Sequence, residues 1–147
     1  GEVLAQTLSI DGIDISTDML AQAAQRLAGW GHNGRLQSAN ITQLPFPDQQ
    51  FDFVMSAHTL EHLSTPGAGL QEMVRVAKPN GLLLIIVTQP GIWGRWIQYR
   101  WRIRLLTKAA LIAKLSALGL TQIDSYLLSG SVWSLNGSVA ILGRVPA

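Results

Sequence analysis

The sequence predicts an α/β fold built on a mostly parallel β-sheet. Short apolar segments alternate with segments whose apolar residues recur at helical spacing, which is the pattern of a doubly wound sheet. Of the 147 residues, 48% are hydrophobic and only 14% are charged, a balance that suits strands buried on both faces. The last two strand candidates follow each other without an intervening helix, which indicates an antiparallel pair at one edge.

The first part of the chain supplies two strands around one helix. Residues 10–15 form a short apolar strand candidate, and Ser16 follows it as a plausible N-cap. Apolar residues at helical spacing then continue as far as Leu27, and a glycine-punctuated loop leads to a weaker strand over residues 35–39.

The same alternation continues to the end of the chain. The remaining predicted elements are a strand over 51–56, a helix over 70–77, a very apolar strand over 82–88, a helix over 107–118, and strands over 121–128 and 138–143. A Lys-Pro-Asn-Gly sequence at residues 78–81 is expected to stop the helix before it. No repeat or low-complexity linker divides these elements, so we expect residues 1–147 to form a single domain.

Composition narrows the classes of function. The absence of cysteine excludes disulfides and thiolate metal sites. The longest apolar run, Leu82 to Val87, is far shorter than the roughly 20 residues of a membrane helix. No basic segment followed by an apolar one opens the chain, so we expect a cytoplasmic protein. A net charge of +2 does not by itself imply a nucleic-acid partner.

Four segments carry a family resemblance, in their order along the chain: GIDISTDMLAQAAQRL, ANITQLPFPDQQFDFVMSAHTLEHL, EMVRVAKPNGLLLIIV and TKAALIAKLSALGL. Together they resemble the class I S-adenosylmethionine-dependent methyltransferases of the ubiquinone/menaquinone-biosynthesis type. The resemblance implies a Rossmann-like methyltransferase fold. It also implies methyl transfer from the cofactor S-adenosylmethionine to a small-molecule or lipid-like acceptor.

The resemblance implies a nucleoside site made by the following residues: Asp14, Ile15, Met19, Ala39, Asn40 and Ile41. Asp14 closes a strand where a carboxylate can accept hydrogen bonds from two ribose hydroxyls; the alternative is an aspartate of the helix start. Ile15 and Met19 would offer apolar surface to the adenine and ribose, or else belong to the core.

Asn40 stands where the family usually has an aspartate that accepts a hydrogen bond from the adenine amino group. An asparagine can still accept through its carbonyl oxygen, but without a charge. Ile41 would donate its backbone N–H to a ring nitrogen of the adenine. The alternative for Asn40 is a turn residue.

The methionine part of the cofactor and the reacting methyl are implied to lie beside Ala57 and His58, at the end of the strand over 51–56, and beside Gly1. His58 is the candidate catalytic residue, because an imidazole can take a proton from an oxygen or nitrogen nucleophile. Alternatively, His58 only shapes the pocket.

The family's first strand and nearly all of its glycine-rich loop have no counterpart here, because Gly1 resembles the last glycine of that loop. In the family fold this strand is central, between the strands at 10–15 and 51–56. We therefore expect the sequence to be a fragment of a longer chain. The alternatives are an element inserted by another copy, as in a homo-oligomer, or a rearranged sheet.

Two further patterns compete with this assignment. His58-Thr-Leu-Glu61-His62 matches a zinc-protease pattern, but a third protein ligand is not evident and no metal is expected. Residues 92–108 interleave aromatic residues with arginines. They would form a helix whose aromatic residues join the core while its arginines stay solvated, bind or cover an anionic or amphipathic substrate, or contact a membrane surface; stacking on nucleobases is the least favoured alternative.

Two functions of other classes therefore stay open beside methyl transfer. The chain could be a non-catalytic interaction module that keeps the fold without binding the cofactor. It could also be a peripheral membrane protein that binds through residues 92–108.

Overall fold

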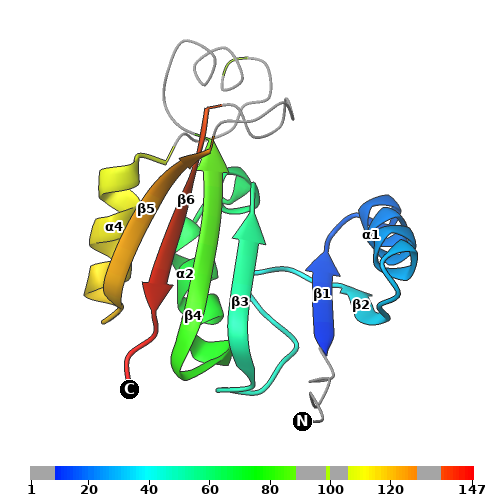
Figure 1. Ribbon diagram of the computed structural model, residues 1–147. Helices are drawn as coiled ribbons and strands as arrows, with labels where there is room; N and C mark the ends of the chain where they lie inside the picture. Colours follow the sequence, from blue (N-terminus) through cyan, green and yellow to red (C-terminus); the bar gives the residue numbers. More distant parts are fainter. Residues whose placement is uncertain (1–8, 89–98, 100–105, 129–136) are drawn as a thin grey trace, which may run out of the picture. The chain divides into compact units, whose positions relative to one another are not determined.

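The computed structural model describes residues 9–88, 99, 106–128 and 137–147 (Figure 1). The chain divides into two compact units, Gly1–Pro45 and Phe46–Ala147. The described residues of each unit form a separate sheet, of two strands in the first unit and four in the second.

The N-terminal unit contains β1 (Ile10–Asp14), α1 (Thr17–Gly29) and β2 (Gly34–Ser38). The two strands pair in parallel along their whole length, so the two chain ends that leave them lie at the same edge. The predicted cap is confirmed, because the Ser16 hydroxyl accepts a hydrogen bond from the backbone N–H of Met19 at 3.3 Å.

The C-terminal unit contains the larger sheet. Its elements are β3 (Phe51–Ala57), the short 3₁₀ helix η1 (Leu60–His62), α2 (Pro66–Val76), β4 (Ala77–Thr88), α4 (Lys108–Ala117), β5 (Thr121–Leu128) and β6 (Ser138–Arg144). The strand order is β3-β4-β6-β5. β3 and β4 are parallel, whereas β6 runs antiparallel to both of its neighbours. The predicted antiparallel pair is thus confirmed as β6 and the edge strand β5.

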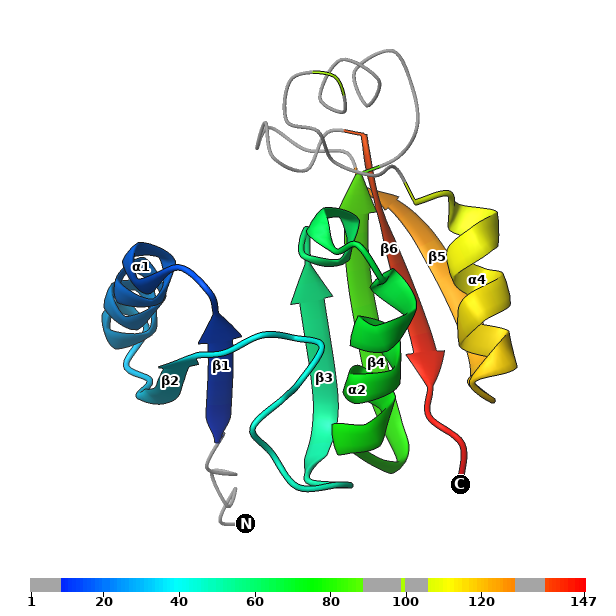
Figure 2. The same ribbon diagram turned by 180° about the vertical axis from the view of Figure 1, so that it is seen from behind.

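Helices cover one face of this sheet. α2 and α4 lie side by side over it in both views (Figures 1 and 2). β4 sends Leu83, Ile85 and Val87 into the core, where all three are fully buried together with Leu70 of α2 and Leu111 of α4. β4 is also an interior strand, with β3 and β6 on its two sides, which suits its high content of apolar residues.

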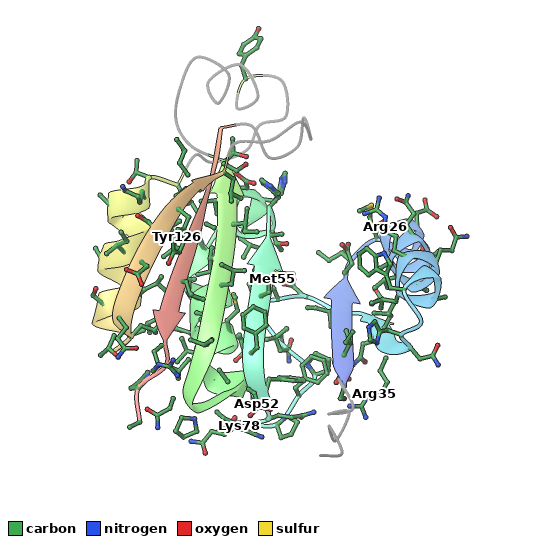
Figure 3. The ribbon with its side chains drawn as sticks, in the orientation of Figure 1. Arg26, Arg35, Asp52, Met55, Lys78 and Tyr126 are labelled. Atoms are coloured by element: carbon green, nitrogen blue, oxygen red, sulfur yellow. The ribbon has the colours of Figure 1, made fainter. Side chains whose placement is uncertain are left out.

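The other face of the same sheet carries apolar residues without a helix over them, within the part of the unit that the structure describes. Phe53 and Met55 of β3 and Tyr126 of β5 are each about half exposed (Figure 3). In the register of the sheet, Met55 lies beside Leu84 of β4, which is itself half-buried. An apolar stripe therefore crosses this face.

The expected helix stop is confirmed, because α2 ends at Val76, and residues 78–81 then form a bulge in β4. β3 residues Phe51 and Phe53 pair with Ala77 and Leu82 of β4, so residues 78–81 loop out between two paired positions. Asn80 has a φ of 63° there, a left-handed conformation that asparagine tolerates better than most residues. β4 consequently begins at Ala77, before the predicted start of the strand.

The boundaries of α2 and α4 can be compared with the helix limits predicted from the sequence. α2 begins at Pro66, four residues before the predicted start, and proline is favoured in the first helical turn. Both ends of α4 agree with the prediction. At its beginning, the Thr107 hydroxyl accepts a hydrogen bond from Ala110 N–H at 3.1 Å. After its end, Gly119 has a φ of 89°.

No helix in the described part of the chain is both long and apolar enough to span a membrane.

We expect Leu70→Ala to lower the free energy of unfolding by about 2–5 kcal/mol, because it would open a cavity in the fully buried interface between α2 and the sheet. Urea denaturation followed by circular dichroism measures the change. Gln71→Ala, at the next and exposed position of the same helix, is the control and should change stability by less than about 0.5 kcal/mol.

Candidate functional site

Asp14 lies at the carboxyl end of β1, the kind of position where open α/β sheets bind ligands. One carboxylate oxygen, Oδ1, accepts a hydrogen bond from Ser16 N–H at 2.8 Å. The other oxygen makes no hydrogen bond with the residues that the structure describes, and the side chain is only half-buried. The carboxylate is therefore fixed in place by one oxygen and open at the other.

Apolar side chains stand next to this carboxylate. Ile15 is 71% exposed and Met19 is 51% exposed. Neither residue lies in the core of the N-terminal unit. The structure of this unit therefore does not support the alternative that they are core residues. Their exposure leaves apolar surface beside a hydrogen-bond acceptor, which suits a ligand with a sugar and a base.

The strand pair brings the adenine-site candidates to the same edge as Asp14. Ala39 N–H donates to the backbone carbonyl of Asp14 at 3.3 Å, which joins the ends of β1 and β2. Asn40 follows directly, but its Oδ1 already accepts from the backbone N–H and the hydroxyl of Thr42, at 2.9 and 2.8 Å. This is the geometry of a turn residue, and a ligand amino group would have to share that oxygen.

Ile41 is buried, and no hydrogen bond of its backbone N–H is found among the described residues. That donor is available for a ring nitrogen, which is the role that the family resemblance implies.

His58 sits at the carboxyl end of β3 in a strained conformation. Its φ of 53° places a non-glycine residue in the left-handed region, which costs on the order of 1–3 kcal/mol and recurs at functional sites. Its backbone N–H still donates to the carbonyl of Ile86 at 2.8 Å. The strand pairing therefore holds the backbone from which the imidazole projects.

A buried carboxylate holds the imidazole. Glu61 of η1 has a side chain only 2% exposed, and its Oε1 lies 3.0 Å from His58 Nδ1. Its other oxygen accepts from the backbone N–H of Thr88, at the end of β4, at 3.1 Å. The Thr88 hydroxyl adds a longer contact of 3.4 Å to Oε1. Glu61 thus links the ends of two neighbouring parallel strands.

The same contacts shift the pKa of Glu61 downward. Burial alone would raise that pKa, since it disfavours the charged form. The hydrogen bond with His58 and the bond from Thr88 N–H favour the carboxylate and outweigh burial. Glu61 is therefore a buried carboxylate kept ionised by its hydrogen-bond donors.

The second ring nitrogen of His58, Nε2, has a different environment from Nδ1. His58 Nε2 is buried and has no hydrogen-bond partner among the described residues. A buried polar atom left unpaired costs about 1–3 kcal/mol, and such atoms in native structures often have a functional reason.

Ala57 precedes His58 and is exposed on the helix-free face of the sheet, where it pairs in register with Ile86. Gly1 lies outside the described residues. The proposed cover segment over 92–108 also falls largely outside them, apart from Tyr99, which is exposed, and residues 106–108.

The zinc-protease pattern does not form the required helix. His58 ends a strand, and His62 lies exposed in η1, so the two histidines do not share a helix face. Among the described residues no group of three histidine or acidic side chains could hold a metal.

Sequence reasoning missed two residues of this cluster. Glu61 was considered only as a companion of a zinc site, and Thr88 only as the end of an apolar strand. One signal was available: a single acid between Leu60 and His62, shortly after a predicted strand, needs a partner if it is buried.

Comparison with known families supports the resemblance. A family model described as "Methyltransferase domain" matches residues 2–85. The demethylmenaquinone methyltransferase of Geobacillus stearothermophilus is 39% identical over 85 residues, which is 56% of this chain and 36% of that protein. The corresponding enzyme of Desulfitobacterium hafniense is 33% identical over 106 residues, or 67% of this chain and 42% of that protein. The chain thus spans well under half the length of these relatives.

Solved structures share the fold at low sequence identity. The CurJ carbon methyltransferase matches with a TM-score of 0.76 and 17% identity, over 95% of this chain and 42% of that one. A putative methyltransferase from Bacillus halodurans matches with a TM-score of 0.75 and 16% identity, over 95% of this chain and 84% of that one. The [4+2]-cyclase SpnF matches with a TM-score of 0.72 and 19% identity, over 95% and 68%. The Rossmann-like methyltransferase fold is therefore confirmed.

The lowered pKa of Glu61 gives a pH dependence with a definite sign. A carboxyl whose pKa is lower in the folded than in the unfolded protein stabilises the fold above its unfolded value, and this contribution disappears as the pH falls through the folded value. We expect Glu61→Gln to lower the free energy of unfolding by ~2 kcal/mol at pH 7. The difference from the parent protein should shrink once the pH falls below 4.5, the ordinary value for glutamate. Urea denaturation at a series of pH values measures both proteins, and a difference that stays constant down to pH 3 would contradict the assignment.

Proposed function

The chain belongs to the class I S-adenosylmethionine-dependent methyltransferase family, and from that premise we propose that it transfers a methyl group to a small-molecule or lipid-like acceptor. The observation that carries the proposal is the half-open carboxylate of Asp14 at the carboxyl end of β1. The fold alone does not specify the reaction, because the [4+2]-cyclase SpnF shares it.

The residues of the N-terminal unit fit a nucleoside. The free oxygen of Asp14 would accept from the sugar hydroxyls, and the N–H of Ile41 would donate to the base. The exposed side chains of Ile15 and Met19 would pack on the apolar faces of the ligand. S-adenosylmethionine, when bound, supplies a sulfonium methyl carbon that is open to attack by an electron-rich atom.

His58 is the residue that would move a proton in this reaction. Its Nε2, which has no hydrogen-bond partner among the described residues, would accept a proton from the attacking group, which becomes a better nucleophile as it loses that proton. Ala57 and Gly1 would lie along the methionine part of the cofactor.

For the acceptor, we propose the reduced form of a quinone. Two relatives are named for demethylmenaquinone methylation. A third, from Geotalea daltonii, is named a ubiquinone/menaquinone biosynthesis C-methyltransferase and is 36% identical over 90 residues, or 58% of this chain and 38% of that protein. A quinone ring is electron-poor, whereas its dihydroxy form can donate electrons from a ring carbon to a methyl group. Contact of residues 92–108 with a membrane surface, a homo-oligomeric state and a cytoplasmic location remain predictions.

The direct test is binding of S-adenosylhomocysteine, measured by calorimetry. We expect micromolar affinity for the parent protein and a dissociation constant about 10- to 100-fold higher for Asp14→Asn. The asparagine keeps an oxygen for Ser16 N–H but replaces the open carboxylate oxygen with an amino group, which cannot accept from a hydroxyl.

Asp18→Asn is the matched control, since Asp18 is an exposed acid in the first turn of α1. Its affinity should equal that of the parent protein. A folded parent protein without measurable binding would instead support the non-catalytic interaction module.

A further inference from the structure

We propose that Glu61 is a positioning residue: it holds the neutral His58 ring with its proton on Nδ1, so that Nε2 is the nitrogen free to take a proton from the methyl acceptor. The assignment deepens the proposed function and rests on it for the identity of the proton donor. The hydrogen-bond geometry from which it follows is independent of any ligand.

The carboxylate determines which nitrogen carries the proton. An ionised carboxylate can only accept hydrogen bonds, so the 3.0 Å contact between Glu61 Oε1 and His58 Nδ1 requires a hydrogen on Nδ1. A neutral imidazole has one N–H. Its other nitrogen, Nε2, must therefore be the acceptor.

The carboxylate itself has little freedom to move. Glu61 is buried, and its Oε2 is held at 3.1 Å by the backbone N–H of Thr88. A backbone N–H cannot exchange its donor role for an acceptor role, so one oxygen is always directed at Thr88. The other oxygen is thereby directed at the imidazole.

The histidine is held from its backbone as well. His58 N–H donates to Ile86 of β4 at 2.8 Å, and the φ of 53° turns the residue out of the path of the strand. Both His58 and Glu61 are thus anchored to β4, by Ile86 and Thr88. The imidazole keeps its orientation because two independent contacts define it.

No other charge in the described part of the chain accounts for this arrangement. The groups that act on Glu61 are His58, three residues before it, and Thr88 of the neighbouring strand, whose hydroxyl is uncharged. His62, the other titratable residue of η1, is exposed to solvent. His58 and Glu61 therefore form an isolated pair.

The pair fits a balanced methyl transfer. The acceptor loses a proton from a hydroxyl to Nε2, and its electron pair is directed to the ring carbon that attacks the methyl carbon. The carbon–sulfur bond breaks with its electrons going to sulfur, which becomes a neutral thioether. The ring carbon then loses its own hydrogen as a proton to water, which restores the aromatic ring as a phenolate, and the imidazolium beside Glu61 returns its proton to the phenolate oxygen.

The sharpest variant is Glu61→Gln, because it should reverse the tautomer. Thr88 N–H can only donate, so it is expected to donate to the amide oxygen of the glutamine. The amino group of the glutamine then faces His58 Nδ1. Nδ1 must then be the acceptor, and the hydrogen moves to Nε2. Nitrogen-15 NMR of the imidazole at about pH 9.5, where an ordinary histidine is neutral, distinguishes the two tautomers directly.

The spectra can be assigned, since the chain has three histidines and His58→Gln removes one set of signals. We expect the Nδ1–H tautomer in the parent protein and the Nε2–H tautomer in Glu61→Gln. Asp52→Asn makes the same chemical change at an exposed acid paired with Lys78, so it should leave the His58 signals unchanged. An Nε2–H tautomer in the parent protein, or an unchanged tautomer in Glu61→Gln, overturns the proposal.

Turnover with chemically reduced demethylmenaquinone gives a second readout. Glu61→Gln should lower kcat by about 10²-fold or more, the range for loss of a general base, while the dissociation constant of S-adenosylhomocysteine stays within about twofold. A merely structural role would weaken both together and leave the tautomer unchanged. A folded parent protein that shows the Nδ1–H tautomer but binds no S-adenosylhomocysteine would refute the proposed function and leave the geometry of the pair in place. Unchanged kcat in Glu61→Gln would refute the role of the pair while the function stands.

Discussion

The buried, ionised carboxylate of Glu61 is the interaction on which the arrangement around His58 depends. Removing a carboxylate from water is costly unless donors replace the lost solvation, and Glu61 obtains them from His58 and Thr88. These donors follow β3 and end β4, so the contact also fixes how two parallel strands terminate relative to each other. The hydrogen bond from His58 that stabilises the charge of Glu61 also orients the imidazole, so one contact serves both the stability of the fold and the proposed chemistry.

The fold could be predicted because local sequence signals agree with the packing. Ser16 and Thr107 cap the helices that they were expected to cap, and the buried run of β4 is the run of highest hydrophobicity. Residues 78–81 were expected to end a helix; α2 does end just before them, at Val76, and they form a bulge in the strand that follows. A turn signal states that the backbone must change direction but does not state which element it interrupts, because that depends on the neighbouring strand.

The candidate site was predictable only in part, for a physical reason. Asp14 could be found because an acid at a strand end is a local pattern, and the structure describes it there. Asn40 shows the limit, since its oxygen is engaged by Thr42, two residues away, and no family pattern states whether a ligand displaces that bond. The partnership of Glu61 with Thr88 joins residues far apart in sequence, and only strand order brings them together.

The helix-free side of the C-terminal sheet has a consequence for handling the protein. β3 pairs only with β4 among the described residues, which makes it an edge strand of the described sheet, and its residues Phe53 and Met55 are about half exposed. An edge of this kind can recruit a strand from a neighbouring molecule, and the sulfur and aromatic surface would strengthen such a stack. A lysine in place of Met55 is the type of change by which natural sheets suppress such pairing.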